Sequence, residues 1–430
     1  MATSTIPPRS KAIKKYTWNA ESVFKSPKEW EAEVQSILNS LPEIEKHKGK
    51  LGEDPESLID GLKAVEALMQ RVQKAFMYAA FSYSVDTGNQ KSSAMYGKAG
   101  GMYGRVAGTV SFVNPELLEI GRAKLDEWMQ RNEILAEYRH SFDDLFRQQE
   151  HVRSAEVEEI LGMLADPLSG AGDSTSILVN ADFKFAPAKG VKGKKIDVTQ
   201  GNIHTALMES PDRKVRQTAF ESYMDKHLEF KNVLATNLST SIKSNVFNMR
   251  ARKHKSSLEA SLFNNNIPVE VFYNLIETFK KKLPVWHRYF ELRRKALGLR
   301  EVTYYDMWAP ITKKKPKIPF EQGVEYICEA LAPLGKEYTD TIRQGTLKDR
   351  WVDVYPNQGK QNGAFSYGAP GTFPFIMMSY TDEVNSMSTL AHELGHSMHS
   401  YLTWKNQPVT YSNYSLFVAE VASNFNQAMM

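Results

Sequence analysis

A mainly α-helical fold of two or three lobes is predicted for this chain by three features of its sequence. Apolar residues recur at intervals of three and four along most of the 430 residues, as they do on the buried face of an α-helix. Hydrophobic residues make up 42% of the chain, which at this length is more than one small core requires. A β-like pattern is prominent only between residues 352 and 380.

The helices are expected to begin near the N-terminus. Asp54 has the character of an N-cap, and Pro55 suits the first helical position after it. Apolar residues then follow at helical spacing: Leu58, Leu62, Val65, Leu68, Met69 and Val72. Similar patterns predict helices over residues 28–41, 157–164, 213–223 and 269–297.

The middle of the chain contains breaks rich in glycine and proline. Between these breaks, residues 177–179 and 183–185 are expected to form short strands. A boundary near residue 200 then divides the chain into an N-terminal helical domain, residues 1–200, and a second domain, residues 201–430.

The segment from Val352 to Tyr380 differs from the rest, with many glycines and little helical period. One or two strands with a loop are expected here, and they lead into a helix. Thr381 is the expected cap of that helix, with Asp382 and Glu383 in its first turn, where the helix dipole favours negative charge.

The charge balance argues against a nucleic-acid partner. There are 54 basic and 50 acidic residues, a net charge of +4. Basic runs such as Arg252 to Lys255 lack interleaved aromatic residues, so we interpret them as solvated surface. The sequence GKQNG at 359–363 lacks the closing residues of a phosphate-binding loop, which leaves nucleotide chemistry without support.

A cytoplasmic protein is expected from the cysteine content and from the absence of a targeting or membrane segment. Cys328 is the single cysteine and cannot form an internal disulfide. It lies in an apolar helical run, so we interpret it as a core residue and not as a nucleophile. The N-terminus lacks an apolar signal region, and apolar stretches such as Phe375 to Met378 are too short to span a membrane.

The sequence AHELGHSMHSYL at 391–402 carries the strongest functional signal. In a helix, His392 and His396 project from one face one turn apart and can bind a single metal ion. Glu393 lies beside them, where it can reach a metal-bound water. This is the HExxH arrangement, and the alternative is a chance match with core or surface histidines.

Glu420 is the predicted third ligand, because it is the one acidic residue after His396. It lies in a second predicted helix, whose expected apolar stripe is Tyr414, Phe417, Val421, Phe425 and Ala428. A turn at residues 406–408 would fold this helix back beside the first and complete a His-His-Glu site with one open position. The alternative for Glu420 is an ordinary exposed glutamate.

His399 is a rival third ligand. It is seven residues from His392, about 10 Å along a helix, and zinc–nitrogen bonds of about 2 Å do not span that distance. The longer HExxHxxGxxH pattern also requires a glycine that is absent here. We therefore expect His399 to support the site or the fold without binding metal.

The segments HELGHSMHS and YSLFVAEVASNFN resemble oligoendopeptidase F, of the thimet oligopeptidase group of zinc metallopeptidases. The resemblance extends over nearly the whole chain and includes YTWNAESVFKSPKEWEAE, SSLEASLFNNNIPVEVFYNLIE, GKQNGAFSYG and PFIMMSY. It implies a two-lobed helical body around a deep substrate channel, with a small β element next to the HExxH helix. Residues 1–200 correspond to the family's N-terminal domain and residues 201–430 to its catalytic domain.

The resemblance also implies an activity and its residues. Zn²⁺ is expected on His392, His396 and Glu420, with Glu393 as the general base that cleaves internal bonds of short peptides. Gly363, Ala364 and Phe365 are expected to pair with the substrate backbone.

Two departures from the family pattern matter. Relatives typically continue beyond the glutamate-bearing helix, whereas this sequence stops at Met430 and is expected to be truncated. Gln427 stands where the family usually has glutamate, and it is expected to orient a ligand histidine less strongly than a carboxylate would. Two alternatives to an active enzyme are a catalytically silent zinc- and peptide-binding fragment and a helical scaffold without metal.

Overall fold

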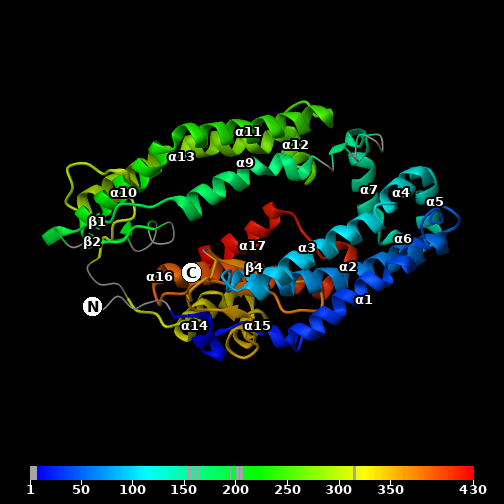
Figure 1. The fold of residues 1–430 in the computed structure, drawn as a ribbon, viewed down its shortest axis with the longest axis horizontal. Helices are drawn as coiled ribbons and strands as arrows, with labels where there is room; N and C mark the ends of the chain where they lie inside the picture. The colour runs from blue at the N-terminus through cyan, green and yellow to red at the C-terminus, as the bar shows by residue number, and fades with distance from the viewer. Residues whose placement is uncertain are drawn as a thin grey trace. The chain divides into compact units, whose positions relative to one another are not determined.

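The computed structural model (Figure 1) describes residues 7–153, 157, 160–161, 164–193, 195–199, 203, 207–312, 316–361 and 363–430. By their contacts the residues form two compact units. Unit 1 combines Met1–Arg147 with Pro316–Met430, and unit 2 is Gln148–Lys315. Helices dominate both units and the strands are short, so the predicted mainly α fold is confirmed.

The two units divide the chain differently from the predicted domains 1–200 and 201–430. Unit 2 is inserted between the two parts of unit 1, so each predicted domain contains residues of both units. The predicted boundary, residue 200, lies outside the described residues.

In the first part of unit 1, the three longest helices, α1, α2 and α3, pack against one another, and α2 and α3 run side by side (Figure 1). The Asp54 carboxylate accepts a hydrogen bond from the Ser57 backbone N–H at 2.7 Å, so the predicted N-cap is confirmed. The helices are α1 Pro27–Glu45, α2 Pro55–Ser84, α3 Gln90–Val110, α4 Val113–Ile120, α5 Arg122–Arg131, α6 Glu133–Ala136 and α7 Arg139–Gln148.

The second part of unit 1 contains a small sheet between helices. The strands are β3 Val352–Asp353, β4 Phe365–Tyr367 and β5 Phe375–Met377, and the helices are α14 Phe320–Ala330, α15 Lys336–Leu347, α16 Val384–Asn406 and α17 Leu416–Met429. The strand order is β3-β5-β4, with β3 parallel and β4 antiparallel to β5. The predicted β element before the HExxH helix is therefore present.

The sheet separates two apolar cores, because successive side chains of a strand point to opposite faces. On β5, Phe375 and Met377 pack into the core built on α1 and α2. Ile376, between them, packs into the core that contains α14 and α16. Cys328 belongs to the second core, where burial raises the pKa of its thiol to about 11, in keeping with a structural cysteine.

The N-terminal segment is attached to β3 by a buried cluster of charged side chains. The Asp353 carboxylate is buried and lies 2.5 Å from Arg9 Nη2 and 2.8 Å from Lys360 Nζ. The Lys360 side chain is also buried, and its ammonium donates further hydrogen bonds to the backbone oxygens of Asp353 and Tyr355. A buried charge requires such partners, so this cluster fixes the N-terminal segment to the sheet.

Unit 2 consists mainly of long helices. They are α9 Ala165–Ile177, α10 Arg213–Glu229, α11 Lys231–Ala251, α12 Ser257–Phe263 and α13 Val269–Ala296, with a two-stranded ladder of β1 Ala188–Lys189 and β2 Lys195–Ile196. The fully buried Asp306 binds Arg213 and Arg216 at 2.8 and 2.9 Å. This ion pair joins the start of α10 to the segment after α13.

The predicted strands in this region are wrong. Ile177 ends α9, residues 178–182 form a π-helical turn, and residues 183–185 belong to no strand. Residues 177–179, Ile-Leu-Val, form an apolar run of three, which has no period that distinguishes strand from helix. Among the described residues, no helix is both long and apolar enough to cross a membrane.

Candidate metal centre

The HExxH segment lies in the middle of α16. Helix α16 is held in unit 1 by a buried apolar face that includes Met387, Leu390, Leu394 and Met398. His392 and His396 lie at the margin of this face, with side chains 23% and 17% exposed. Both imidazoles are therefore fixed by the packed helix yet remain accessible.

The start of α16 differs from the prediction. The helix begins at Val384 with Glu383 as its N-cap residue, and Asp382 has a positive φ of 56°. The Thr381 hydroxyl lies 2.8 Å from Ser386 Oγ, before the helix starts. Thr381 therefore contacts the first turn through a side chain and is not the N-cap.

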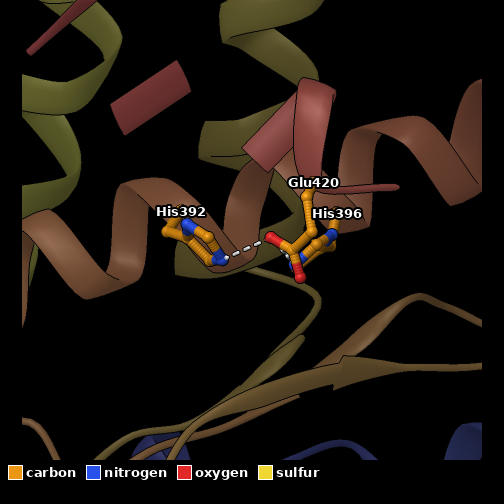
Figure 2. Close-up of side chains that lie close together, drawn as sticks. All are labelled: His392, His396 and Glu420. Carbon is orange, nitrogen blue, oxygen red and sulfur yellow. Dashed lines mark ion pairs between the residues drawn. The ribbon is translucent and has the colours of Figure 1, made fainter. Parts of the chain in front are cut away.

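Helix α17 brings Glu420 to the histidine pair, as Figure 2 shows. Glu420 Oε2 lies 3.3 Å from His392 Nε2 and 3.7 Å from His396 Nε2. One ligand atom from each of the three residues lies within 4.8 Å of the others. The Ser423 hydroxyl, one turn along α17, donates a 2.8 Å hydrogen bond to Glu420 Oε2. Helical periodicity did not predict this orienting contact, although Ser423 follows Glu420 by three residues, which in a helix places the two side chains next to each other.

Gly395 permits the close approach of α17. A Cβ at this position would meet Ser423 Cα at 2.5 Å and the Ala422 carbonyl oxygen at 2.6 Å. Any side chain here would push the α17 backbone away, and Glu420 with it.

The predicted apolar stripe of α17 does not face α16. Phe417, Val421 and Phe425 are 60%, 56% and 51% exposed. The buried residues of α17 are instead Ala419, Ser423 and Asn426. Because Gly395 brings the two backbones together, only small or hydrogen-bonded side chains fit between them. The predicted helix is confirmed, and the apolar stripe that predicted it lies outside its contact with α16.

Glu393 lies next to the histidines and is 6% exposed. Burial raises the pKa of its carboxyl to about 7, and the nearby Glu420 charge adds to the increase. The Ser366 backbone N–H on β4 opposes this by hydrogen bonding to the carboxyl. Glu393 Oε2 has no hydrogen-bond partner among the described residues. A carboxyl with a pKa near neutrality and a free oxygen is suited to accept and return a proton.

Gln427 contacts the ligand shell, as its position seven residues after Glu420 suggests. Its Oε1 atom lies 3.2 Å from His392 Nδ1, and its Nε2 donates a 2.9 Å hydrogen bond to Ser388 Oγ. When His392 Nδ1 carries the proton, it can donate a hydrogen bond to Gln427 Oε1. The His392 Nε2 lone pair, on the side of Glu420, is then available to bind a metal ion.

His399 lies outside the three-residue group. Its ring stacks on Tyr414 at a centroid distance of 3.8 Å, and its Nδ1 is buried without a hydrogen-bond partner in the described part of the chain. The Tyr414 hydroxyl is in turn 2.6 Å from Ser400 Oγ. His399 thus joins α16 to the segment before α17.

The expected substrate-pairing segment is only partly a strand. Strand β4 begins at Phe365, whereas Gly363 has a φ of 92°, which an extended strand does not allow. Of Gly363, Ala364 and Phe365, only Phe365 lies in the ladder with β5. A role in substrate binding stays a prediction for all three.

The donor set matches the ligands that zinc prefers. Two imidazoles and one carboxylate give a three-ligand set of the kind found in catalytic zinc sites. Burial lowers the pKa of His396, which favours the neutral ring that can bind a metal. With an ordered carboxylate and a free Glu393 oxygen beside them, the residues fit a metal with an open coordination position.

Two family models and several curated proteins match this chain. The family model described as "Peptidase family M3" matches residues 206–430, and the "Oligopeptidase F" model matches residues 116–185. Oligopeptidase PepF of Bacillus subtilis is 40% identical over 99% of this chain, which spans 63% of that relative. Group B oligopeptidase PepB of Streptococcus agalactiae is 33% identical over 98% of this chain and 70% of its own length.

Solved structures show the same similarity. The crystal structure of oligoendopeptidase-F from Enterococcus faecium matches with a TM-score of 0.66 and 28% identity, over 94% of this chain and 66% of that one. A Chlamydophila abortus structure matches with a TM-score of 0.79 and 29% identity, over 99% and 71% of the two chains. The chain therefore belongs to peptidase family M3 and is a relative of oligoendopeptidase F.

Proposed function

We propose that this chain is a zinc-dependent endopeptidase that hydrolyses internal bonds of short oligopeptides in the cytoplasm. The observation that carries the proposal is the meeting of His392, His396 and Glu420 around one point, with the Glu393 carboxyl beside them. The names of its relatives support a peptide substrate, since they are oligopeptidases. The single, buried Cys328 is in keeping with a reducing compartment.

In this proposal each residue has one role. His392, His396 and Glu420 hold the metal through Nε2, Nε2 and a carboxylate oxygen. A bound zinc ion supplies Lewis acidity, which polarises a carbonyl and lowers the pKa of a coordinated water. Ser423 and Gln427 orient Glu420 and His392 through the hydrogen bonds described above.

Glu393 performs the proton transfer. Its carboxylate takes a proton from the attacking water as the new C–O bond forms at the scissile carbonyl carbon. The same carboxyl then gives the proton to the leaving amine nitrogen as the C–N bond breaks. In the metal-free protein, burial raises the pKa of Glu393 to about 7, toward the range suited to a group that takes and returns a proton.

The test measures zinc content and hydrolysis separately. We expect about one zinc per chain in the wild type and its loss in His392→Ala and His396→Ala. Stoichiometric zinc in both variants would overturn the ligand assignment. Hydrolysis is followed with a quenched fluorescent peptide, with and without a chelator.

A pair of isosteric variants separates the two carboxylates. Glu393→Gln should retain zinc and lose hydrolysis, whereas Glu420→Gln should weaken zinc binding itself. Equal zinc affinities in these two variants would contradict the assigned roles. Wild-type protein that binds zinc but does not cleave peptides would instead support the silent zinc- and peptide-binding alternative.

A further inference from the structure

Strand β4 and the residue after it run along one face of α16. Glu393, Ser397 and Trp404 share that face, because they follow one another at intervals of four and seven residues. The hydroxyl oxygens of Ser397 and Ser366 are 2.8 Å apart. Just after β4, a Cβ at Gly368 would come 2.6 Å from the Trp404 ring. The strand and the helix are therefore in close contact at two successive points.

The hydrogen-bond pattern of the sheet directs the Ser366 amide away from β5. The Ile376 N–H donates to the Trp351 carbonyl oxygen at 2.8 Å, so Ile376 bonds on the β3 side. Hydrogen-bonded pairs alternate in an antiparallel ladder, so β5 bonds to β4 through Phe375 and Met377. Ser366 is opposite Ile376, and its N–H therefore points to the outer edge of the sheet.

The Glu393 carboxyl accepts a hydrogen bond from this amide. Glu393 lies one turn before Ser397 on the face of α16 that contacts β4, and the bond from the Ser366 N–H favours its charged form. Glu393 Oε2 is buried without a partner in the described part of the chain, so the bond falls on Oε1. One carboxyl oxygen is thus held by the protein, and the other is available to a water.

Ser397 holds Ser366 in place through two hydrogen bonds. Ser397 is fully buried, and its hydroxyl donates to the Pro374 carbonyl oxygen at 3.2 Å. A hydroxyl has a single hydrogen, so the Ser366 hydroxyl is the donor of the 2.8 Å bond to Ser397 Oγ. Pro374 directly precedes β5, so Ser397 joins α16 to both strands.

Loss of the Ser397 hydroxyl would deprive two groups of this partner, the Pro374 carbonyl oxygen and the Ser366 hydroxyl. Buried polar groups without partners are costly, so β4 would shift on α16 to find others. The Ser366 N–H moves with the strand and alters the orientation of the Glu393 carboxyl. A general base must be within hydrogen-bond reach of its proton, and a displacement of about 1 Å can cost about 100-fold in rate.

We propose that Ser397 is a positioning residue, which acts through Ser366 to hold the Glu393 carboxyl in the orientation that proton transfer requires. The proposal rests on the function proposed above, in which Glu393 is the general base. The three metal ligands are not part of this chain of hydrogen bonds. Ser397 is therefore expected to affect the chemical step and not the affinity for zinc.

The first experiment measures peptide hydrolysis and zinc affinity of the full chain with Ser397→Ala. In the zinc-loaded variant kcat should fall by about 10- to 100-fold and KM should stay within about 2-fold, because the lost orientation matters only in the transition state. Zinc affinity, from competition with a chelator, should stay within about 2-fold. The control Ser84→Ala removes another buried hydroxyl, which bonds to the Ala80 carbonyl oxygen of α2, and should leave kcat unchanged.

A double variant shows whether the two serines act as one link. Ser366→Ala removes the donor to Ser397 but keeps the backbone N–H, so it should lower kcat less than Ser397→Ala does. The double variant should be no more than about 3-fold slower than Ser397→Ala alone, because one link is lost in both. Reductions that multiply in the double variant would contradict the shared link.

The second experiment detects the contact between Ser366 and Glu393 without cleavage. Hydrogen exchange of the Ser366 amide is measured at single-residue resolution in the zinc-loaded full chain. An edge amide without a partner exchanges quickly, whereas a hydrogen-bonded amide is protected. We expect protection in the wild type, and exchange at least about 10-fold faster in Glu393→Ala and in Ser397→Ala.

The outcomes separate this proposal from the proposed function. When the wild type cleaves peptides, an unchanged kcat in Ser397→Ala overturns the positioning role, as does an unprotected Ser366 amide. A fall in zinc affinity that matches the fall in kcat also overturns it, because the variant then disturbs the metal site itself. Protection that both Glu393→Ala and Ser397→Ala remove supports the positioning role, even when the wild type cleaves nothing and the endopeptidase function fails.

Discussion

Replacing Gly395 with alanine tests whether the contact between α16 and α17 sets the geometry of the metal site. The new Cβ would lie 2.5 Å from Ser423 Cα, which is 0.9 Å short of an ordinary contact of 3.4 Å. The obstructing atoms belong to the α17 backbone, so the helix itself must move. Ser423 is one turn from Glu420, and a movement of that size shifts the carboxylate that now lies 3.3 Å from His392 Nε2.

The variant is expected to bind zinc more weakly and to lose a modest amount of stability. Zinc affinity should fall by about 10- to 100-fold, the range seen when residues that orient metal ligands are lost. Overpacking costs about 1–3 kcal/mol, while alanine gains up to about 1 kcal/mol over glycine in a helix. The metal-free protein should therefore lose no more than about 2 kcal/mol.

Zinc affinity is measured by competition with a chromophoric chelator, and stability by urea unfolding of the metal-free protein. The matched control is Gly101→Ala, also within a helix, where an added Cβ meets no atom within 4 Å. It should raise stability by about 0.5–1 kcal/mol and leave zinc affinity unchanged. Wild-type zinc affinity in Gly395→Ala would refute the argument.

Three further predictions concern charge and hydrogen bonding. Folding raises the pKa of Glu393 from its usual 4.5 to about 7, because burial favours the protonated carboxyl. The protonated carboxyl therefore contributes fully to the stability of the metal-free protein below pH 4.5, and this contribution is lost as the pH rises through about 7. Glu393→Gln should then stabilise the metal-free protein at pH 8 but not at pH 4, and an equal effect at both pH values in urea unfolding would contradict the shift. Asp353→Asn leaves the Lys360 ammonium buried without its carboxylate partner, and it should lower the free energy of unfolding in urea by about 3–5 kcal/mol. The control Glu43→Gln breaks an exposed ion pair with Lys46 and should lower it by less than about 1 kcal/mol. Gln427→Glu places a charged acceptor on His392 Nδ1 and should tighten zinc binding in the chelator competition, while Ser388→Ala, which frees the Gln427 amide, should weaken it.

The sequence predicted the metal centre better than its surroundings. The spacing of His392 and His396 follows from helix geometry alone, and Glu420 was identified because no other acidic residue follows the motif. The structure brings these three residues together. Their roles as ligands stay a proposal.

The periodicity of α17 did not predict which of its faces is buried. A stripe such as Phe417, Val421 and Phe425 is normally the buried face of a helix, and here it is exposed. What decides the packing is the absence of a side chain at Gly395, a residue in another helix 25 positions before Glu420. Periodicity is a property of a single helix, so it does not reveal which residue of a second helix packs against it.

The division into units was also hidden from local patterns. The boundary near residue 200 was placed from composition, whereas the units are defined by contacts between residues far apart, such as Arg9 and Asp353.

The ion pair between Arg9 and Asp353 has a consequence for the order in which the chain folds. The two residues are 344 positions apart, so unit 1 cannot complete its core until the strands after residue 350 have been synthesised. Unit 2 is continuous in sequence and leaves the ribosome earlier, which allows it to fold while unit 1 is still incomplete. During that interval Trp18 and Phe81 lack the Phe375 ring that later packs on both. Until that ring is present, the N-terminal helices expose an apolar face, and transiently exposed apolar surface of this kind favours aggregation.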